Sequence, residues 1–245
     1  MDHRAAEEFV KYRIANTTVN EYPFPHFVIE KIFPTDYYLQ ILQNWPGSDR
    51  FVSIADTPRT SGDSYRERHI VNLPKLSIEP NWKGKEFWES FSEWFLGDRF
   101  LTFLVSHYMP WIKSSRLLKE EIEVSADGLL VQDHDGYGIG PHTDAPHRLV
   151  STLFYCPATG DDADLGTSLY VPTDEAEIDL KISPKHFDRK LFSKIYTAPY
   201  IPNCLFGFVV SPNSFHGVDK IERPTIRRNA ILHFAKLQKG GAAKN

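Results

Sequence analysis

Three side chains with metal-binding chemistry occur in the second half of the chain. His142 and Asp144 form a His-x-Asp pair, and residues i and i+2 of an extended strand point to the same face. A second histidine, His216, lies 74 residues after His142 and follows the apolar run 205–210, which has the pattern of a buried strand. Two imidazoles and one carboxylate on one side of a metal leave its other positions open, which suits non-haem iron(II) oxygen chemistry. The three residues are therefore the predicted metal ligands and catalytic centre.

The sequence around the pair strengthens this interpretation. A His-x-Asp pair arises easily by chance in a chain with 10 histidines, and Asp144 would then merely cap a turn. Here the glycine-rich stretch 136–140 precedes the pair, and a clear strand pattern over 148–155 follows it. We expect a flexible lip before the metal ligands rather than a core strand.

A single arginine in the last predicted strand points to an anion. Period-two alternation puts Arg228 on one face with Ala230, Leu232 and Phe234, which are all apolar. A guanidinium in an apolar interior is costly unless it meets an anion, and its planar fork suits a carboxylate. The predicted anion is a dicarboxylate whose other end chelates the metal. The alternative is that Arg228, near the start of its strand, turns outward to solvent.

The elements that position these residues change along the chain. Strands at the spacing seen in the second half are typical of a sandwich or barrel, and no linker divides the 245 residues. We expect one domain, with a mostly helical buttress over 1–121, a β core over 122–236 and a tail at 237–245, of which residues 239–245 are expected to be disordered. The predicted helices are 5–13, 36–42, 84–96 and 98–109, and the predicted strands are 27–29, 128–133, 148–156, 166–171, 193–198, 204–210 and 226–235. A long loop with some strand is expected over 51–72.

Composition excludes several classes of protein. The formal charge of −4 disfavours a nucleic-acid or anionic-membrane partner. Cys156 and Cys204 fit small buried hydrophobic residues rather than a disulfide framework. The first residues lack the apolar segment of a signal peptide, and no apolar run approaches the ~20 residues of a membrane span. The expected location is the cytoplasm, with a small-molecule or peptide substrate, while the oligomeric state stays open.

The motifs resemble those of the 2-oxoglutarate/Fe(II)-dependent dioxygenase superfamily, in particular its small prolyl-hydroxylase-like members. The family pattern is His-x-Asp, a distal His, and an Arg or Lys about ten residues later, and Arg228 lies 12 residues after His216. The resemblance implies a mainly β fold, a double-stranded β-helix of the jelly-roll, cupin type, with flanking N-terminal helices. It also implies Fe(II), 2-oxoglutarate and O₂, and hydroxylation of a C–H bond with release of succinate and CO₂.

The resemblance also assigns roles to individual residues. Arg228 and Tyr155 would hold the far carboxylate of 2-oxoglutarate. Gln132 stands where prolyl hydroxylases often have a tyrosine and would hydrogen-bond the co-substrate. Because Asp144 is present, halogenation is disfavoured, since halogenases of this family leave that position free for halide.

Two other functions use the same ligands. One is a cupin-like protein that binds a metal or ligand without turnover, and the other is a zinc-type hydrolase, which has no need of Arg228. Arg66, Arg68 and Arg148 could meet an anionic substrate, but we interpret them as part of a solvated face. His134 and His147 are interpreted as loop residues, and His233, which alternation places on the face opposite Arg228, as structural.

Overall fold

Two antiparallel sheets form the centre of the molecule. The computed structural model describes residues 2–60, 65–76, 82–118, 121–173, 178 and 187–238, so the predicted disorder of residues 239–245 lies outside the described residues. The larger sheet has seven strands in the order β1-β9-β6-β11-β4-β3-β2, and the smaller has four in the order β5-β10-β7-β8. The strands are β1 (His26–Glu30), β2 (Val52–Ser53), β3 (Arg68–Asn72), β4 (Val124–Asp133), β5 (Ile139–His142), β6 (Arg148–Tyr155), β7 (Ser168–Pro172), β8 (Phe192–Thr197), β9 (Cys204–Val209), β10 (His216–Val218) and β11 (Arg228–Leu237).

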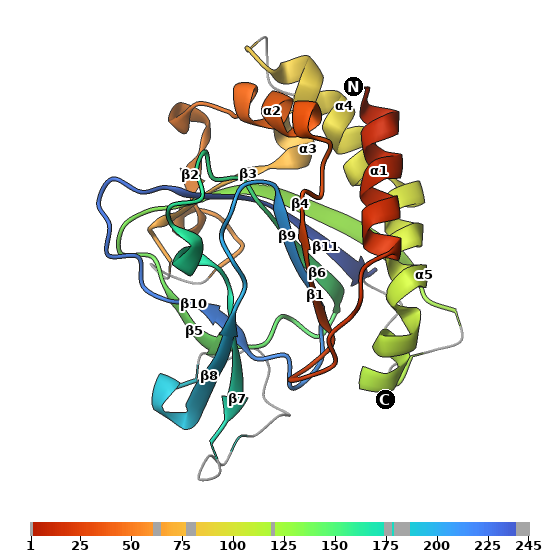
Figure 1. Cartoon of the computed structure of the whole chain (residues 1–245), viewed down its shortest axis with the longest axis vertical. Coiled ribbons are helices and arrows are strands. Elements are labelled where there is room, and N and C mark those ends of the chain that lie inside the picture. Colours follow the sequence, from red (N-terminus) through yellow and green to blue (C-terminus); the bar gives the residue numbers. More distant parts are fainter. Residues whose placement is uncertain are drawn as a thin grey trace.

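Helices from the first half of the chain cover one side of the larger sheet, and the smaller sheet lies on its other side (Figure 1). The α-helices are α1 (His3–Ala15), α2 (Thr35–Gln43), α3 (Leu73–Leu76), α4 (Lys85–Phe95) and α5 (Asp98–Ser115), and short 3₁₀ turns span Ser48–Arg50, Ile54–Asp56, Ala163–Leu165 and Arg189–Leu191. The fold is therefore mainly β with flanking helices, as predicted.

Alternation along the strands separates two apolar layers. Leu130 of β4 packs into the cluster beneath the helices, whereas Leu129 and Val131 belong to a second cluster on the opposite face of the sheet. In the first cluster, the Phe95 ring of α4 lies 5.3 Å from the Phe154 ring of β6. Aromatic residues of the helices thus form the core between helices and sheet, and the other face is left for the site.

The N-terminal part also contributes strands. β1 pairs with β9, and β3 pairs with β4 in the register Arg68↔Asp133, so the region expected as a mostly helical buttress supplies three strands of the larger sheet. Asn203 ties this part to the β8–β9 loop, because its side chain bonds both the backbone N–H and the carbonyl of Phe33. Within the polar stretch after Phe51, the described strands β2 and β3 pair at the edge of the sheet, in agreement with the expected loop with some strand.

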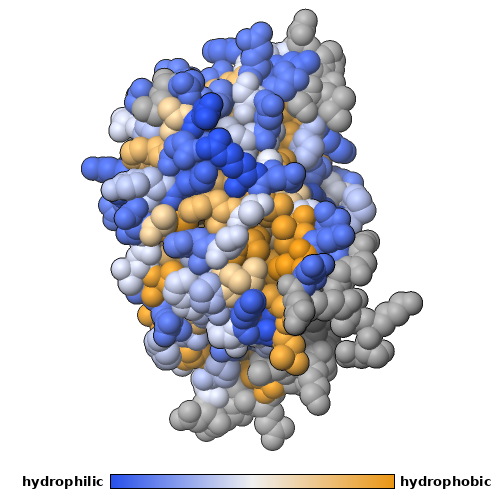
Figure 2. Space-filling view, turned by 90° about the vertical axis from the view of Figure 1, so that its right-hand side faces the viewer, coloured by the Kyte–Doolittle hydropathy of each residue, from blue (hydrophilic) through white to orange (hydrophobic). Residues whose placement is uncertain are grey.

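The outer surface of the helical layer is mixed in character. Figure 2 shows this side, with mostly hydrophilic side chains in its upper part and hydrophobic ones visible among polar neighbours below. Within the described residues, none of the helices has the length and apolar character needed to cross a membrane. Cys156 and Cys204 are both buried and unpaired with one another, as the sequence indicated.

Candidate metal centre

Strand pairing brings the three predicted ligands together. β10 runs antiparallel to β5, and His216 is the direct partner of His142, with ring centroids 4.3 Å apart. Asp144 follows two residues after β5 ends, and one ligand atom from each of the three residues lies within 4.8 Å of the others. The sequence separation of His142 and His216 is therefore bridged by the smaller sheet.

A close approach of two strands makes this register possible. A Cβ atom at Gly217, next to His216, would lie 2.5 Å from the carbonyl oxygen of Ile139. Only glycine lets β10 come this near to β5. The prediction that 136–140 forms a flexible lip is thus partly wrong. The last two residues of this stretch begin β5, and that strand fixes the position of His142.

Backbone carbonyls orient both imidazoles in the same way. Nδ1 of His142 lies 3.0 Å from the Gly140 carbonyl oxygen, and Nδ1 of His216 lies 2.9 Å from that of Ser214. A carbonyl only accepts, so each Nδ1 carries the proton and Nε2 keeps its lone pair. Burial lowers the pKa of His216, against the opposing effect of Asp144, so the ring is neutral at neutral pH, as a metal ligand must be.

Two donors hold the Asp144 carboxylate in its charged form. Arg148 Nη1 donates to one oxygen at 2.6 Å, and Ser151 Oγ donates to the other at 2.5 Å. Burial acts to raise the pKa of Asp144, but Arg148, followed by the two histidines and Ser151, lowers it to about 2. Two neutral imidazoles and one ionised carboxylate are the donor set that a divalent facial-triad site requires, so these residues fit iron(II).

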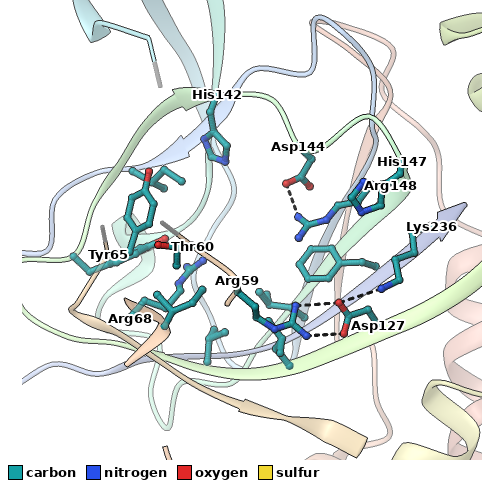
Figure 3. A pocket seen from close by; sticks show the side chains of 17 residues that line it. Arg59, Thr60, Tyr65, Arg68, Asp127, His142, Asp144, His147, Arg148 and Lys236 are labelled. Carbon is teal, nitrogen blue, oxygen red and sulfur yellow. Dashed lines mark hydrogen bonds and ion pairs between the residues drawn. The ribbon is translucent and has the colours of Figure 1, made fainter. Parts of the chain in front are cut away.

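A cavity of about 310 Å³ opens beside the triad. Figure 3 shows Tyr65 and Arg68 on one side of it, and Arg59, Asp127 and Lys236 on the other, below Asp144 and Arg148. Its described lining comprises Ile54, Arg59, Thr60, Tyr65, Arg68, Asp127, Leu129, Val131, Tyr137, Ile139, His142, Asp144, His147, Arg148, Leu232, Phe234 and Lys236. The size suits a small ligand, and the cations in the lining outnumber the carboxylates.

Arg228 is fully buried, so the solvent-facing alternative is wrong. Its guanidinium bonds the Leu165 carbonyl oxygen at 2.5 Å, Asp133 Oδ2 at 2.9 Å and Thr167 Oγ1 at 3.3 Å. The reasoning that a buried guanidinium needs an anion holds, but that anion is Asp133 of the chain itself. An external dicarboxylate does not follow from the burial of Arg228 alone.

Arg68 is the cation that faces the cavity at this end, and the interpretation of it as part of a solvated face is wrong. Arg68 donates hydrogen bonds to the Asp133 carboxylate from Nε at 2.6 Å and from Nη2 at 2.9 Å. Its guanidinium lies 4.3 Å from the Tyr137 ring centroid. Asp133 pairs across the sheet with Arg68 of β3 and Arg228 of β11. In the sequence, the alternation of Asp133 with Leu129 and Val131 could have revealed this cluster, because it places the Asp133 carboxylate on the apolar inner face of β4. Arg148 likewise lines the cavity.

The two remaining co-substrate candidates lie in different places. Tyr155 is buried beside Arg228, whose guanidinium is 5.2 Å from its ring, and its hydroxyl bonds the backbone N–H and Oγ1 of Thr167. Gln132 alternates with the cavity-lining Val131, so it faces the helical side of β4 and is absent from the described cavity lining. Its placement does not support contact with a co-substrate in the cavity.

The other histidines that the sequence singled out also lie in different places. His147 is exposed and lines the cavity, whereas the His134 ring lies against His69, with centroids 4.3 Å apart. His233 is buried beneath the helices, 5.0 Å from the Phe95 ring and 5.4 Å from that of Phe100, consistent with a structural role.

Comparison with known proteins gives a likeness in fold. No family model and no curated protein matches the chain. A crystal structure of the non-haem α-ketoglutarate-dependent epimerase SnoN from nogalamycin biosynthesis matches with a TM-score of 0.54 and 9% identity over 95% of this chain and 81% of that one. SnoN in complex with Fe³⁺, α-ketoglutarate and nogalamycin RO matches with a TM-score of 0.50 and 10% identity, over 95% and 84% of the chains. A Pseudomonas putida prolyl-4-hydroxylase matches at 13% identity over 94% and 98%, with a TM-score of 0.48. At such identities the SnoN likeness establishes the fold alone: this chain folds like a non-haem α-ketoglutarate-dependent enzyme.

Proposed function

We propose that the protein is an Fe(II)- and 2-oxoglutarate-dependent dioxygenase that hydroxylates a C–H bond of a small molecule or peptidyl side chain. The observation that carries the proposal is the triad of His142, Asp144 and His216, of which His142 and Asp144 lie in the wall of a cavity. SnoN, which shares the fold, is an α-ketoglutarate-dependent enzyme and has been solved with Fe³⁺ and α-ketoglutarate.

The strand order supports a double-stranded β-helix as the core of this enzyme. Strands β4, β6, β9 and β11 lie in the larger sheet, and β5, β7, β8 and β10 form the smaller one. The chain therefore crosses repeatedly between two facing antiparallel sheets, as a jelly roll does. In this arrangement the metal ligands come from the smaller sheet and the loop after β5, and the cavity floor from the larger sheet.

Bound iron would supply a site at which O₂ reacts with 2-oxoglutarate, giving succinate, CO₂ and an oxidant for the substrate. The protein's own residues prepare this site. Asp144, kept ionised by Arg148 and Ser151, offsets part of the metal charge, and the two Nδ1–H···O=C bonds fix the imidazoles. Leu129, Val131 and Phe234 give the cavity an apolar floor that limits water near the metal.

We propose that the far carboxylate of 2-oxoglutarate binds at the end of the cavity that Arg68 lines. Two guanidiniums share the single carboxylate of Asp133, which leaves one positive charge in excess. Arg68 lines the cavity, so it would contact the co-substrate directly, and Arg228 would hold Asp133 from behind. Tyr155 would act through Thr167, which also receives a bond from Arg228.

An anaerobic titration with Fe(II) and 2-oxoglutarate tests the proposal. The wild-type protein should develop a visible charge-transfer band, and His216→Ala should lose it because the metal then has two ligands in place of three. His147→Ala is the matched control, because this exposed histidine lines the same cavity outside the triad, and it should keep the band. Arg68→Gln should weaken 2-oxoglutarate binding by roughly tenfold or more, since a bidentate charge-assisted contact is lost.

Three outcomes would contradict parts of this proposal. Absence of the band in the wild-type protein would remove the iron/2-oxoglutarate assignment. A band without succinate formation on any candidate substrate would favour a cupin-like protein without turnover. Zinc-dependent hydrolysis that is indifferent to Arg68→Gln would favour a hydrolase with the same ligands.

A further inference from the structure

The inner face of β4 carries a second aspartate far from the first. Asp127 and Asp133 both project toward the cavity side, with Leu129 and Val131 between them. Six residue-to-residue steps of extended strand separate them, or roughly 20 Å at about 3.3 Å per residue. One molecule of 2-oxoglutarate, with a five-carbon chain, is too short to reach both ends.

Asp127 is the centre of a group that we name the outer cluster, made of Arg59, Asp127 and Lys236. Arg59 donates to both oxygens of Asp127, at 2.9 and 3.0 Å, and also to Asn72 Oδ1. Lys236 Nζ lies 3.5 Å from Asp127 Oδ2. Figure 3 shows the outer cluster below Asp144, with Arg148 between the two. Two cations share one carboxylate here, as at the Asp133 end.

The charges in and behind the cavity are unbalanced. Arg59, Arg68, Arg148 and Lys236 line it against Asp127 and Asp144, and behind it Arg228 and Asp133 cancel one another. A divalent metal and the dianion of 2-oxoglutarate also cancel, so two formal positive charges remain among the residues of the lining that the structure describes. The whole chain has a formal charge of −4, so this excess is local to the cavity. Low-dielectric walls strengthen the attraction of such a site for an anion.

A second, larger cavity opens the outer cluster to solvent. Arg59, Asp127 and Lys236 also line a cavity of about 1150 Å³ bounded by residues 50–53, 56–58 and part of β3. Among the described residues, its lining adds the cations of Arg50, Arg66 and Lys75, against one further carboxylate, Asp56. A ligand can therefore approach the metal from the outer cluster, whereas Asp133 and Arg228, which lie behind Arg68 at the opposite end, are fully buried.

We infer that the primary substrate is an organic anion, whose carboxylate or phosphate group binds Arg59 and Lys236 while its carbon chain extends over Leu129 and Phe234 toward the triad. This inference rests on the proposed function for its reaction, but the binding it describes does not depend on iron. Arg148, stacked on the Phe234 ring at 3.7 Å, lines the path between the anion and Asp144.

Calorimetric titration of the full-length protein with three six-carbon probes tests this inference. Hexanoate and hexyl phosphate carry the anion, and hexanamide is the uncharged match of the first. The titrations are made anaerobically with 2-oxoglutarate present, so that the Arg68 end is occupied, and with and without Fe(II). We expect hexanoate or hexyl phosphate to bind roughly tenfold more tightly than hexanamide, and the tighter of the two identifies the source of the anion.

Variants locate the binding. Arg59→Gln and Lys236→Gln should each weaken anion binding, and together by roughly tenfold or more. Arg99→Gln is the control, because this arginine of α5 pairs with Glu7 and Glu8 in the helical layer. Equal binding of hexanamide, or anion binding unchanged in the double variant, would overturn the inference.

The two proposals fail in distinguishable ways. The charge-transfer band without hexanoate or hexyl phosphate binding would overturn the anion site and leave the iron enzyme. Anion binding that depends on Arg59, in a protein without the band, would keep the site and overturn the iron chemistry.

Discussion

The two ends of β4 carry the same chemical arrangement at different depths. At each end one aspartate sits between two cations, Arg68 and Arg228 at Asp133, and Arg59 and Lys236 at Asp127. The side chains of Asp133 and Arg228 are 0% exposed, whereas those of Asp127, Arg59 and Lys236 are 19%, 27% and 30% exposed. Arg68 is 16% exposed and lines the cavity, but the rest of the Asp133 cluster, which we call the sealed end, is built into the fold. The whole Asp127 cluster, the open end, is accessible to exchangeable ligands.

Depth decides what each cluster contributes. Breaking a buried ion pair leaves an uncompensated charge away from water and costs about 3–5 kcal/mol. A partly exposed pair is screened by solvent and contributes about 0–1 kcal/mol. We therefore expect substitutions at the sealed end to affect folding first, and substitutions at the open end to affect ligand binding with little effect on folding.

The largest expected effect is that of Asp133→Asn. This change leaves the guanidiniums of Arg68 and Arg228 facing each other without a carboxylate and should lower the free energy of unfolding by about 3–5 kcal/mol. Denaturant unfolding followed by circular dichroism measures it. A loss below about 1 kcal/mol would mean that burial does not distinguish the two ends.

Arg228→Lys should give an intermediate effect. Lysine keeps the charge but cannot donate at once to Leu165, Asp133 and Thr167, so we expect a loss of about 2 kcal/mol in the free energy of unfolding. Arg59→Lys at the open end is the comparison and should cost less than about 1 kcal/mol. Equal losses of unfolding free energy in the two variants would show that the planar guanidinium contributes no more to stability at the sealed end than at the open end.

The smallest effect is expected for Asp127→Asn, at about 0–1 kcal/mol near pH 7. Burial acts to raise the pKa of Asp127, but Arg59 and Lys236 lower it below its ordinary value of 3.8. The charged form therefore stabilises the fold above pH 3.8, and this contribution is lost as the pH falls through the lowered pKa. The difference in unfolding free energy between wild type and variant should shrink toward zero in that range. If this difference in unfolding free energy grew as the pH fell, the predicted direction of the pH dependence would be wrong.

The sequence by itself determined the identity of the candidate metal ligands and the faces of the strands. His-x-Asp with its flanking sequence and the distal histidine selected His142, Asp144 and His216. Alternation in β11 placed Arg228 on an otherwise apolar face, and the structure buries it. Alternation is a local property, because each residue's face follows from its own strand.

Only the tertiary structure decided which groups meet. Arg228 finds Asp133 and Arg68 because β11, β4 and β3 are neighbours in one register, and the segment containing Arg68 had been interpreted as a loop with some strand. Gln132 turns away from the cavity for the same reason that Asp133 turns toward it. Partners across strands depend on long-range pairing, and a one-residue change of register would exchange the two faces. The charges of the site could be read from the chain, but their pairing could not.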